Sequence, residues 1–511
     1  MMRLRRRRVT EPDPRPSPMV FLVLVLMLVT RPVLGATWTD ATVPFYHGAP
    51  DRAGNYIVPG LNWQSASAVH RVQEFDGKIE GHVYAQPLYW RPPGAGPALV
   101  IAATESDLVY GLDADTGHIV WRTALGRPVP GSALPCGNID PLGITGTPVI
   151  DADRGTLYLD AMTDDRGKPR HLVYGLRLSD GGVLPGFPLD VAAGLAVHGI
   201  RFDSAAQNQR GALALLNGRI FVPFGGHFGD CSDYRGTVVA VDVDPPKVAA
   251  GWATRARKGG IWAPAGLSEA GGFLYFATGN TDGAKRWGDG EGVFRVGPGL
   301  MRTFDPRDFF APSDWKQLDA DDMDISGVTP LPLNLPGAEM LLALGKDGNA
   351  YLLDRANLGG IGGTVGTIRT ARGVITTAPA AYPIRDSVFV AYEAQGAACP
   401  NGSYVPGIGA LAVTADPSRR LYSAWCARLD GRGAPIVTTT NGSSDPIVWA
   451  AGAEGDDRLH GFRGDTGEEI FTGAAAGDGM TRLRHLATIL VAAGHFYIAG
   501  DGRIFAFRLP H

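Results

Sequence analysis

One short unit recurs along most of this chain. An apolar strand, a turn, a second strand with an acidic or small polar residue, and a Gly-rich turn return about every 40 to 50 residues. The 70 glycines and 38 prolines among 511 residues supply the turns that such a unit needs. Because a four-stranded unit cannot bury both of its faces alone, neighbouring units must stack and close into a ring. The sequence predicts an all-β fold, an eight-bladed β-propeller of four-stranded antiparallel blades.

The expected innermost strands are short apolar segments that begin each blade. They lie at 98–103, 146–151, 211–216, 263–267, 327–331, 378–382, 436–440 and 484–490. A second strand is expected after seven of them, at 156–160, 219–224, 273–278, 340–345, 387–392, 446–452 and 495–499. An N-terminal strand around 70–75 would complete the last blade and close the ring.

The third strand of the expected blade is clearest at 108–112. It ends in Asp-Ala-Asp-Thr-Gly at 113–117 and continues into Ile-Val-Trp at 119–121. Asp and Gly favour a tight turn, and the β-branched and aromatic residues on either side favour strands. The pattern returns at 459–471 and, more loosely, at 351–354 and 238–242.

The N-terminus has the order of an export signal. A basic run at 3–8 precedes an apolar stretch from Met19 to Val29, which is too short to span a bilayer, and small residues follow at 33–36. We expect a signal peptide at 1–36 and a single propeller domain at 37–511, in a periplasmic or secreted protein. An uncleaved signal anchor is the alternative. No other segment predicts a stable membrane span.

Four cysteines remain after the expected leader, and an even number in an exported chain favours disulfides over free thiols. Three pairings are possible. Proximity along the chain favours Cys136 with Cys231 and Cys399 with Cys426.

At this point the chain resembles a known family. The segment 113–117 together with Trp121 resembles the repeat of pyrroloquinoline-quinone (PQQ) propellers, in which the Trp docks one blade on the next. Further likeness lies at 84–88, 143–148, 276–280 and 345–348, so that it extends over nearly the whole mature chain. Quinoprotein dehydrogenases and scaffold proteins of outer-membrane assembly share this architecture.

The resemblance implies roles for five residues. In quinoprotein alcohol dehydrogenases the cofactor stacks on a Trp, an acidic residue and an Asn hold Ca²⁺, a basic residue faces the quinone, and an Asp is the base. Trp262 resembles the stacking residue and Asn280 the calcium ligand. Asp324 resembles the catalytic base, and Lys346 resembles the basic residue. Asp230 lies near the position of the acidic calcium ligand.

Each of these residues also has a structural interpretation. Trp262 fits a blade-docking aromatic, and Asn280 follows a glycine in what can be an ordinary turn. Asp324 belongs to an acidic run typical of a solvated loop, and Lys346 fits an exposed turn. The chain also departs from the family, because it has no adjacent cysteine pair and has Asp230 where a Glu is expected.

Three further residues in a Gly-rich middle region could face the propeller axis. They are His198, Arg210 and His227. No zinc-ligand spacing links them, and we interpret them as structural.

The predicted function is an exported, quinoprotein-like propeller, an oxidoreductase that uses PQQ and calcium to oxidise an alcohol or sugar hydroxyl. The cysteines form no haem-attachment motif, so an external electron acceptor is expected. The alternative is a non-catalytic propeller that scaffolds envelope proteins or binds a small molecule or carbohydrate. Net charge of −4 without a basic patch in the mature chain gives no reason to expect nucleic acid.

Overall fold

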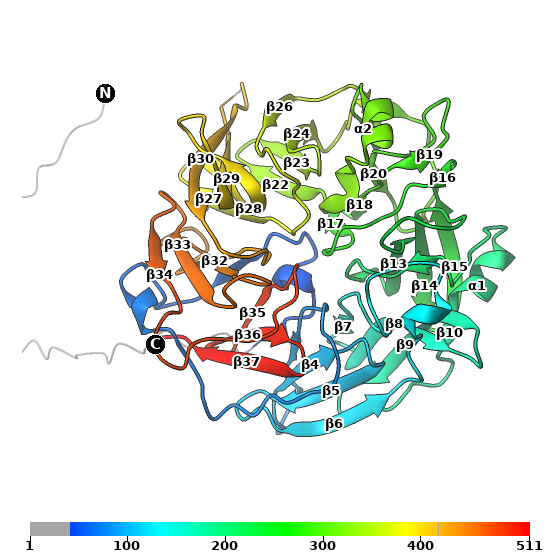
Figure 1. Cartoon of the computed structure of the whole chain (residues 1–511), viewed down its shortest axis with the longest axis horizontal. Coiled ribbons are helices and arrows are strands. Elements are labelled where there is room, and N and C mark those ends of the chain that lie inside the picture. The colour runs from blue at the N-terminus through cyan, green and yellow to red at the C-terminus, as the bar shows by residue number, and fades with distance from the viewer. Residues whose placement is uncertain (1–40, 417, 511) are drawn as a thin grey trace, which may run out of the picture. The chain divides into compact units, whose positions relative to one another are not determined.

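Eight small antiparallel sheets follow one another around a central axis, as Figure 1 shows. The structure is a computed structural model that describes residues 41–416 and 418–510. The predicted signal peptide at 1–36 lies outside the described residues. Among the helices within them, none is long and apolar enough to cross a membrane. The predicted fold class, an eight-bladed β-propeller, is confirmed.

The first four blades are described from the innermost strand outward. Blade 1 contains β3 (Leu88–Trp90), β4 (Leu99–Ala103), β5 (Leu108–Asp113) and β6 (Ile119–Ala124). Blade 2 contains β7 (Val149–Asp151), β8 (Thr156–Asp164), β9 (Pro169–Arg177) and β10 (Leu189–Asp190). Blade 3 contains β12 (Ala214–Leu216), β13 (Arg219–Gly226), β14 (Thr237–Val243) and β15 (Pro246–Ala253), with β11 (Gln207–Asn208) on the end of β13. Blade 4 contains β17 (Ser268–Ala270), β18 (Phe273–Ala277), β20 (Val293–Val296) and β21 (Phe309–Ala311), with β25 (Gly360–Ile361) outside β21.

The other four blades repeat this plan. Blade 5 contains β22 (Leu331–Leu335), β23 (Ala338–Leu344), β24 (Asn349–Asp354) and β26 (Gly366–Arg369). Blade 6 contains β27 (Ala380–Ile384), β28 (Ser387–Ala398), β29 (Tyr404–Thr414) and β30 (Leu421–Arg428). Blade 7 contains β31 (Ile436–Thr439), β32 (Ile447–Ala451), β33 (Leu459–Arg463) and β34 (Glu469–Phe471), with β1 (Asn55–Ile57) inside β31. Blade 8 contains β35 (Ile489–Ala492), β36 (His495–Gly500), β37 (Arg503–Arg508) and β2 (His70–Arg71).

A few short elements lie between the blades. A two-stranded ribbon joins β16 (Arg257–Lys258) to β19 (Thr281–Asp282). The helices are α1 (Val191–Val197), α2 (Trp315–Asp321) and the 3₁₀ turns η1 (Tyr46–Gly48), η2 (Ser65–Ala68), η3 (Gly131–Ala133), η4 (Pro306–Asp308) and η5 (Ile325–Gly327).

The ring is held together by apolar clusters between neighbouring blades. Successive residues of a strand point to opposite faces of its sheet, so each blade contacts both of its neighbours. In β31, Ile436 packs with blade 8 and Val437 packs with blade 6. Eight such clusters, one at each contact between adjacent blades, are present in the described residues. In 41–416 and 418–510, each blade therefore buries both of its apolar faces against a neighbour, which requires a closed ring.

Tryptophans dock outer strands onto the next blade, as the resemblance implies. Trp121 of β6 packs in the cluster between blades 1 and 2, and its Nε1 donates to the Leu178 carbonyl at 2.8 Å. Trp425 of β30 does the same at blade 7, donating to the Gly464 carbonyl at 2.7 Å. A Cβ on Gly181 would lie 2.6 Å from the Trp121 ring, so this contact requires glycine.

Closure of the ring uses the N-terminal strand that the sequence predicts. In β2, His70 pairs with Arg508 and Arg71 pairs with Phe507 of β37, which makes β2 the outermost strand of blade 8. Both favoured disulfides, Cys136–Cys231 and Cys399–Cys426, are present.

The innermost strands are displaced from some of the predicted ones. The segment 98–103 corresponds to the second strand of blade 1, because β3 lies inside it. The segment 263–267 is a loop that leads to β17, and most of 484–490 is a loop that leads to β35.

The chain before β1 passes through the middle of the ring (Figure 1). The ring of Tyr46 packs in a buried cluster with Ala212, Ala265, Ala378 and Ala434, which belong to four different blades or the loops leading into them. Tyr46 of this N-terminal segment also lines a small pocket that shares Tyr84 and Arg210 with the cavity described next.

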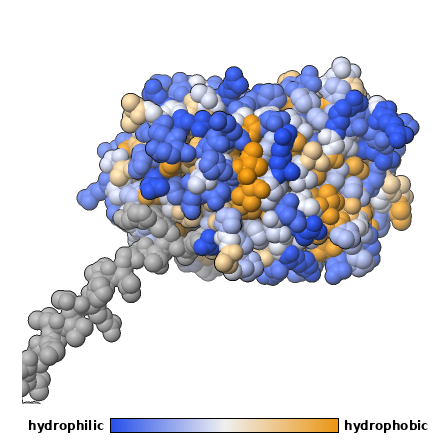
Figure 2. Space-filling view, turned by 90° about the horizontal axis from the view of Figure 1, so that it is seen from below, coloured by the Kyte–Doolittle hydropathy of each residue, from blue (hydrophilic) through white to orange (hydrophobic). Residues whose placement is uncertain are grey.

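The face in Figure 2 is mainly hydrophilic, and its apolar surface is confined to narrow bands. That face therefore has no broad apolar patch of the kind that marks a stable protein interface.

Candidate functional site

All five residues assigned from the sequence line one cavity of about 840 Å³. Asp230 lies between β13 and β14, Trp262 between β16 and β17, and Asn280 between β18 and β19. Asp324 immediately precedes η5, and Lys346 lies between β23 and β24. The ring therefore brings together residues from three blades. A cavity of this size, with a few convergent polar groups, is typical of a small-molecule site.

The ring of Trp262 packs directly against the backbone of two glycines, where any side chain would collide with it. A Cβ on Gly225 would come within 2.9 Å of its ring, and one on Gly260 within 2.5 Å. Tyr234 meets the ring edge-on, with centroids 6.3 Å apart. The indole Nε1 is buried and has no hydrogen-bond partner in the described residues. The indole is thus held by packing, and it presents an aromatic wall to the cavity.

Asp324, Asn280 and Lys346 form one hydrogen-bonded unit. The Asn280 backbone N–H donates to Asp324 Oδ1 at 2.7 Å, and Lys346 Nζ forms an ion pair with Asp324 Oδ2. The Lys346 backbone N–H donates to the Asp324 carbonyl at 2.9 Å. Gly279 must be a glycine, because a Cβ there would lie 2.3 Å from Asp324 Oδ1. The carboxylate is 2% exposed and therefore fixed in one orientation.

Burial and neighbouring charges set the proton affinities of this unit. Burial raises the pKa of Asp324, although Lys346 and the Asn280 N–H oppose the shift. Burial would lower the pKa of Lys346, but the charges of Asp324 and Asp322 outweigh burial and hold it above the usual value. Behind them, burial and the Asp324 charge raise the pKa of Glu291 well above its usual range. Sequence reasoning missed Glu291, whose Oε2 accepts from the Ile325 N–H at 2.8 Å.

Asp230 has a cationic partner where the resemblance implies Ca²⁺. Its Oδ2 lies 3.2 Å from Lys258 Nζ, and its Oδ1 accepts from the Tyr234 hydroxyl. Lys258 of β16 pairs with Thr281 of β19, so the ribbon holds Lys258 beside Asn280. No motif of the sequence predicts a role for Lys258, because its position depends on this short ribbon.

The oxygen atoms that the cavity offers as metal ligands do not fit calcium. Ca²⁺ takes six to eight oxygen ligands, mostly carboxylates and carbonyls. Here the predicted carboxylate ligand, Asp230, is already neutralised by Lys258, and the neighbouring Asp324 by Lys346, so that a divalent ion beside them would face two ammonium groups. Within 41–416 and 418–510, no three His, Cys, Asp or Glu side chains converge to hold a metal.

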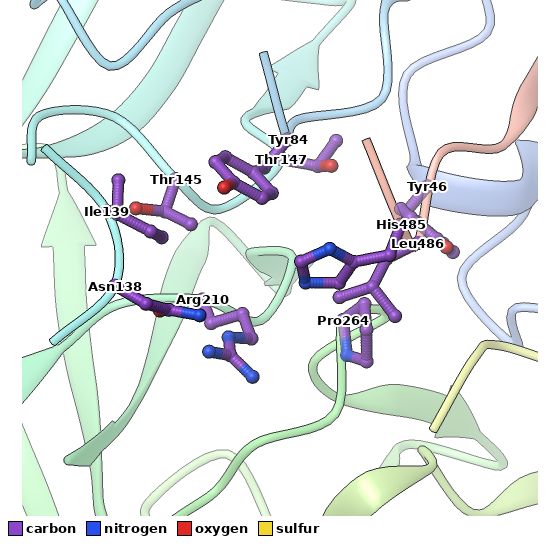
Figure 3. A pocket seen from close by; sticks show the side chains of 10 residues that line it. All are labelled: Tyr46, Tyr84, Asn138, Ile139, Thr145, Thr147, Arg210, Pro264, His485 and Leu486. Atoms are coloured by element: carbon purple, nitrogen blue, oxygen red, sulfur yellow. The ribbon is translucent and has the colours of Figure 1, made fainter. Parts of the chain in front are cut away.

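Of the three residues of the Gly-rich middle region, two line the cavity and one does not. Arg210 and His227 line the cavity, whereas His198 follows the last turn of α1, exposed, with Nε2 3.2 Å from the Val248 carbonyl. Burial lowers the pKa of His227 to about 4, so its ring is neutral at pH 7. Arg210, which the sequence suggested could face the axis, lines the cavity beside Tyr84 and Asn138, as Figure 3 shows.

The fold and this cavity define a propeller with a candidate ligand site, and comparisons with known proteins agree at the level of the fold. No protein-family model matches this chain, and no curated protein matches its sequence. Among solved structures, it is similar to quinohemoprotein alcohol dehydrogenase from Comamonas testosteroni, with a TM-score of 0.62 and 14% identity over 93% of this chain and 81% of that one.

Two further solved structures give the same result. Quinohemoprotein alcohol dehydrogenase ADHIIG from Pseudomonas putida HK5 has a TM-score of 0.60 and 14% identity, over 92% of this chain and 80% of that one. A europium-containing methanol dehydrogenase has a TM-score of 0.60 and 12% identity, over 91% of this chain and 89% of that one. At these identities the likeness shows a quinoprotein-like propeller fold and leaves the chemistry to the site.

Proposed function

We propose that this protein is a quinoprotein-type dehydrogenase that binds PQQ in the axial cavity and oxidises an alcohol or sugar hydroxyl. One observation carries the proposal. Trp262, Asn280, Asp324 and Lys346 are far apart in the sequence but line the same cavity. Scattered positions would instead have favoured a scaffold.

The cavity offers what a flat anionic quinone needs. Trp262 would stack on the ring system, and Lys346 would lie against the quinone oxygens, where a cation stabilises developing negative charge. When bound, PQQ supplies a two-electron acceptor for the substrate. The chain supplies the position, the exclusion of water and the proton transfer.

Asp324 is the proposed base. Its fixed carboxylate faces the cavity, and a pKa raised by burial strengthens it as a proton acceptor for the substrate hydroxyl. Lys346 keeps the carboxylate ionised before the transfer and loses part of that ion pair when Asp324 takes the proton. Calcium has no role in this mechanism, because Lys258 already neutralises Asp230 and Lys346 already neutralises Asp324.

Two disulfides in the described residues support export, since such bonds persist in oxidising compartments. We therefore place the protein in the periplasm or outside the cell, where a separate acceptor would take the electrons.

Calorimetric titration of the mature protein with PQQ tests the proposal. We expect a dissociation constant of about 1 μM or tighter, corresponding to about −8 kcal/mol. The double variant Trp262→Ala, Asn280→Ala should lose binding. The matched control is Trp63→Ala, because Trp63 is half-buried and packs on Arg463 away from the cavity.

Turnover of short alcohols and sugars with an artificial acceptor then tests catalysis. If the folded wild-type protein does not bind PQQ, the dehydrogenase proposal is rejected. A scaffold or a glycan-binding propeller would then be the better description.

A further inference from the structure

A carboxylate and an imidazole form a pair on a second wall of the cavity. His485 Nδ1 lies 2.6 Å from Glu454 Oε1, and both residues line the cavity. Glu454 belongs to the turn between β32 and β33 of blade 7, and His485 belongs to the loop that leads to β35 of blade 8. Asp324, the proposed base, lies in the loop between blades 4 and 5. The pair is therefore separate from Asp324.

The contact with Glu454 determines which ring nitrogen of His485 is free. An ionised carboxylate only accepts hydrogen bonds, so Nδ1 carries the hydrogen and the neutral ring keeps its lone pair on Nε2. In 41–416 and 418–510, Nε2 of His485 has no hydrogen-bond partner. Figure 3 shows the imidazole projecting into the space that Tyr84 and Arg210 also line. His485 thus presents an unoccupied basic nitrogen to the cavity.

Neighbouring charges keep Glu454 ionised. Burial alone would raise its pKa, but the hydrogen bond from His485 and the charges of His485 and Arg432 outweigh burial and lower the pKa. Arg484, the residue before His485, is itself neutralised by an ion pair with Asp501. A carboxylate behind an imidazole stabilises the imidazolium that forms when the other ring nitrogen takes a proton. The pair therefore has the chemistry of a general base.

The loop that carries His485 is fixed to blade 7. The Glu454 N–H donates to the Leu483 carbonyl at 3.2 Å, and the Leu486 N–H donates to the Arg432 carbonyl at 3.2 Å. Glu454 has a φ of 57° and Leu486 a φ of 71°, a region of backbone conformation that favours glycine. Strained backbone of this kind is concentrated at functional sites, where the surrounding structure holds it in place.

The proposed reaction must release protons from this cavity. Oxidation of an alcohol to a carbonyl compound yields two protons and two electrons, and two molecules of a one-electron acceptor take the electrons. Asp324 can take the hydroxyl proton, but its side chain is only 3% exposed. Lys346 beside it is an ammonium, which has donors only and cannot accept that proton. The side chains of His485 and Glu454 are 30% and 38% exposed, so this pair reaches both the cavity and the solvent.

The other histidine of the cavity does not have these properties. His227 is buried, and its Nε2 lies 3.0 Å from the Ala205 carbonyl, so that Nε2 donates and is not free. Burial lowers the pKa of His227 to about 4, which makes its ring a poor proton acceptor at neutral pH.

We propose that His485 and Glu454 are the route by which protons leave the cavity. Nε2 of His485 takes a proton released in the cavity, by way of substrate hydroxyls or ordered water between the two walls, and an N–H bond forms. That bond breaks when solvent water takes the proton, and the ring returns to its neutral state. Two such transfers in each turnover balance the two electrons. The inference rests on the proposed dehydrogenase function, and Glu454 acts in it as a positioning residue.

Histidine ¹⁵N NMR of the protein without PQQ tests the state of the ring. We expect neutral His485 to carry its proton on Nδ1 and to show the resonance of an unprotonated Nε2. His485→Gln assigns the signal, and Glu454→Gln should shift the ring toward the other tautomer. A neutral His485 that is protonated on Nε2 would overturn the proposal whether or not PQQ binds.

Turnover of the PQQ-loaded protein with ferricyanide, a one-electron acceptor, tests the transfer. We expect His485→Gln to lower kcat at least about tenfold and Glu454→Gln to lower it less. Reduction of the loaded variants by alcohol in a single turnover without acceptor should stay within about twofold of the wild type, because Asp324 is intact. Millimolar imidazole should restore turnover of His485→Gln. The matched control is His118→Gln, because His118 is an exposed histidine that pairs with Asp76 outside the cavity.

The outcomes separate proton release from a structural role and from failure of the dehydrogenase proposal. A purely structural pair would give variants with a lower melting temperature and weaker PQQ binding, and imidazole would not restore their turnover. That result, or an active wild type whose kcat is unchanged by His485→Gln, would overturn the proton route alone. A wild type that binds no PQQ or oxidises no alcohol would reject the dehydrogenase proposal and the proton route with it.

Discussion

At the scale of single residues, the proposed chemistry depends on the charge of Asp324. Asp324→Asn keeps the shape of the side chain but cannot accept the substrate proton. We expect turnover with an artificial acceptor to fall about 10²- to 10⁴-fold, the usual contribution of a general base. PQQ affinity should stay within a fewfold. Asp321→Asn, in the same acidic run but exposed and outside the cavity, is the matched control and should keep full activity. An Asp324→Asn enzyme with more than a tenth of wild-type turnover would contradict the assignment.

Lys258 leads to a prediction about metals. Since its ammonium already faces Asp230, we expect EDTA to leave the melting temperature of the wild type unchanged and to change its PQQ affinity by no more than about twofold. Lys258→Ala would expose the Asp230 carboxylate beside Asn280. In that variant, millimolar Ca²⁺ should raise the melting temperature. A wild-type protein that loses tenfold or more of its PQQ affinity in EDTA would show that calcium binds despite the lysines.

The sequence predicted some residues of the site and missed others for a physical reason. Trp262, Asn280 and Lys346 belong to segments that resemble a known motif, and all of them reach the cavity. Arg210 belongs to no such motif, and only its Gly-rich surroundings suggested a place near the axis. Lys258 was missed because the β16–β19 ribbon brings it to the cavity, and that contact is not encoded in local spacing.

At the scale of elements, the hairpin of β4 and β5 carries two buried carboxyls at its turn. Burial raises the pKa of Glu105 from 4.5 to about 7 and, with the help of the Glu105 charge, that of Asp107 from 3.8 to about 8. Between the ordinary pKa values and the raised ones, the folded chain therefore binds more protons than the unfolded chain. The free energy of unfolding must fall as the pH rises through this range.

We expect the melting temperature to be higher at pH 5 than at pH 8.5. Glu105→Gln should recover about 1–3 kcal/mol of unfolding free energy at pH 8.5 and change little at pH 5. The control Glu468→Gln alters an exposed carboxylate and should have no effect at either pH. Differential scanning calorimetry of the three proteins at both pH values measures this, and a pH-independent effect of Glu105→Gln would refute it.

Most strands could be predicted, and the errors at the innermost strands have a common cause. Outer strands such as the one predicted at 108–112 have alternating apolar residues and a turn motif, and this strand is confirmed as β5. The loops that lead to the axis are also small and apolar, because residues such as Ala265 pack on Tyr46. Apolarity alone cannot separate these loops from the strands that follow them.

At the scale of the whole molecule, the two disulfides constrain very different lengths of chain. Cys136–Cys231 closes 95 residues and joins the loop before β7 to the loop after β13, whereas Cys399–Cys426 closes 27 residues within blade 6. The loss of chain entropy in the unfolded state grows with loop length. On that basis the first should contribute about 4–5 kcal/mol and the second about 3–4 kcal/mol.

Each bridge can be removed by paired Cys→Ala changes. The two resulting variants should differ in both their stability and their affinity for PQQ. The first pair should lower the free energy of unfolding by about 1 kcal/mol more than the second. It should also weaken PQQ binding severalfold, because Asn138 and residues 227–230 of the two bridged loops line the cavity. The second pair lies away from the cavity and should leave affinity unchanged. Equal affinities in the two variants would show that the blades hold those loops without the bridge, because ring closure alone would then fix the shape of the site.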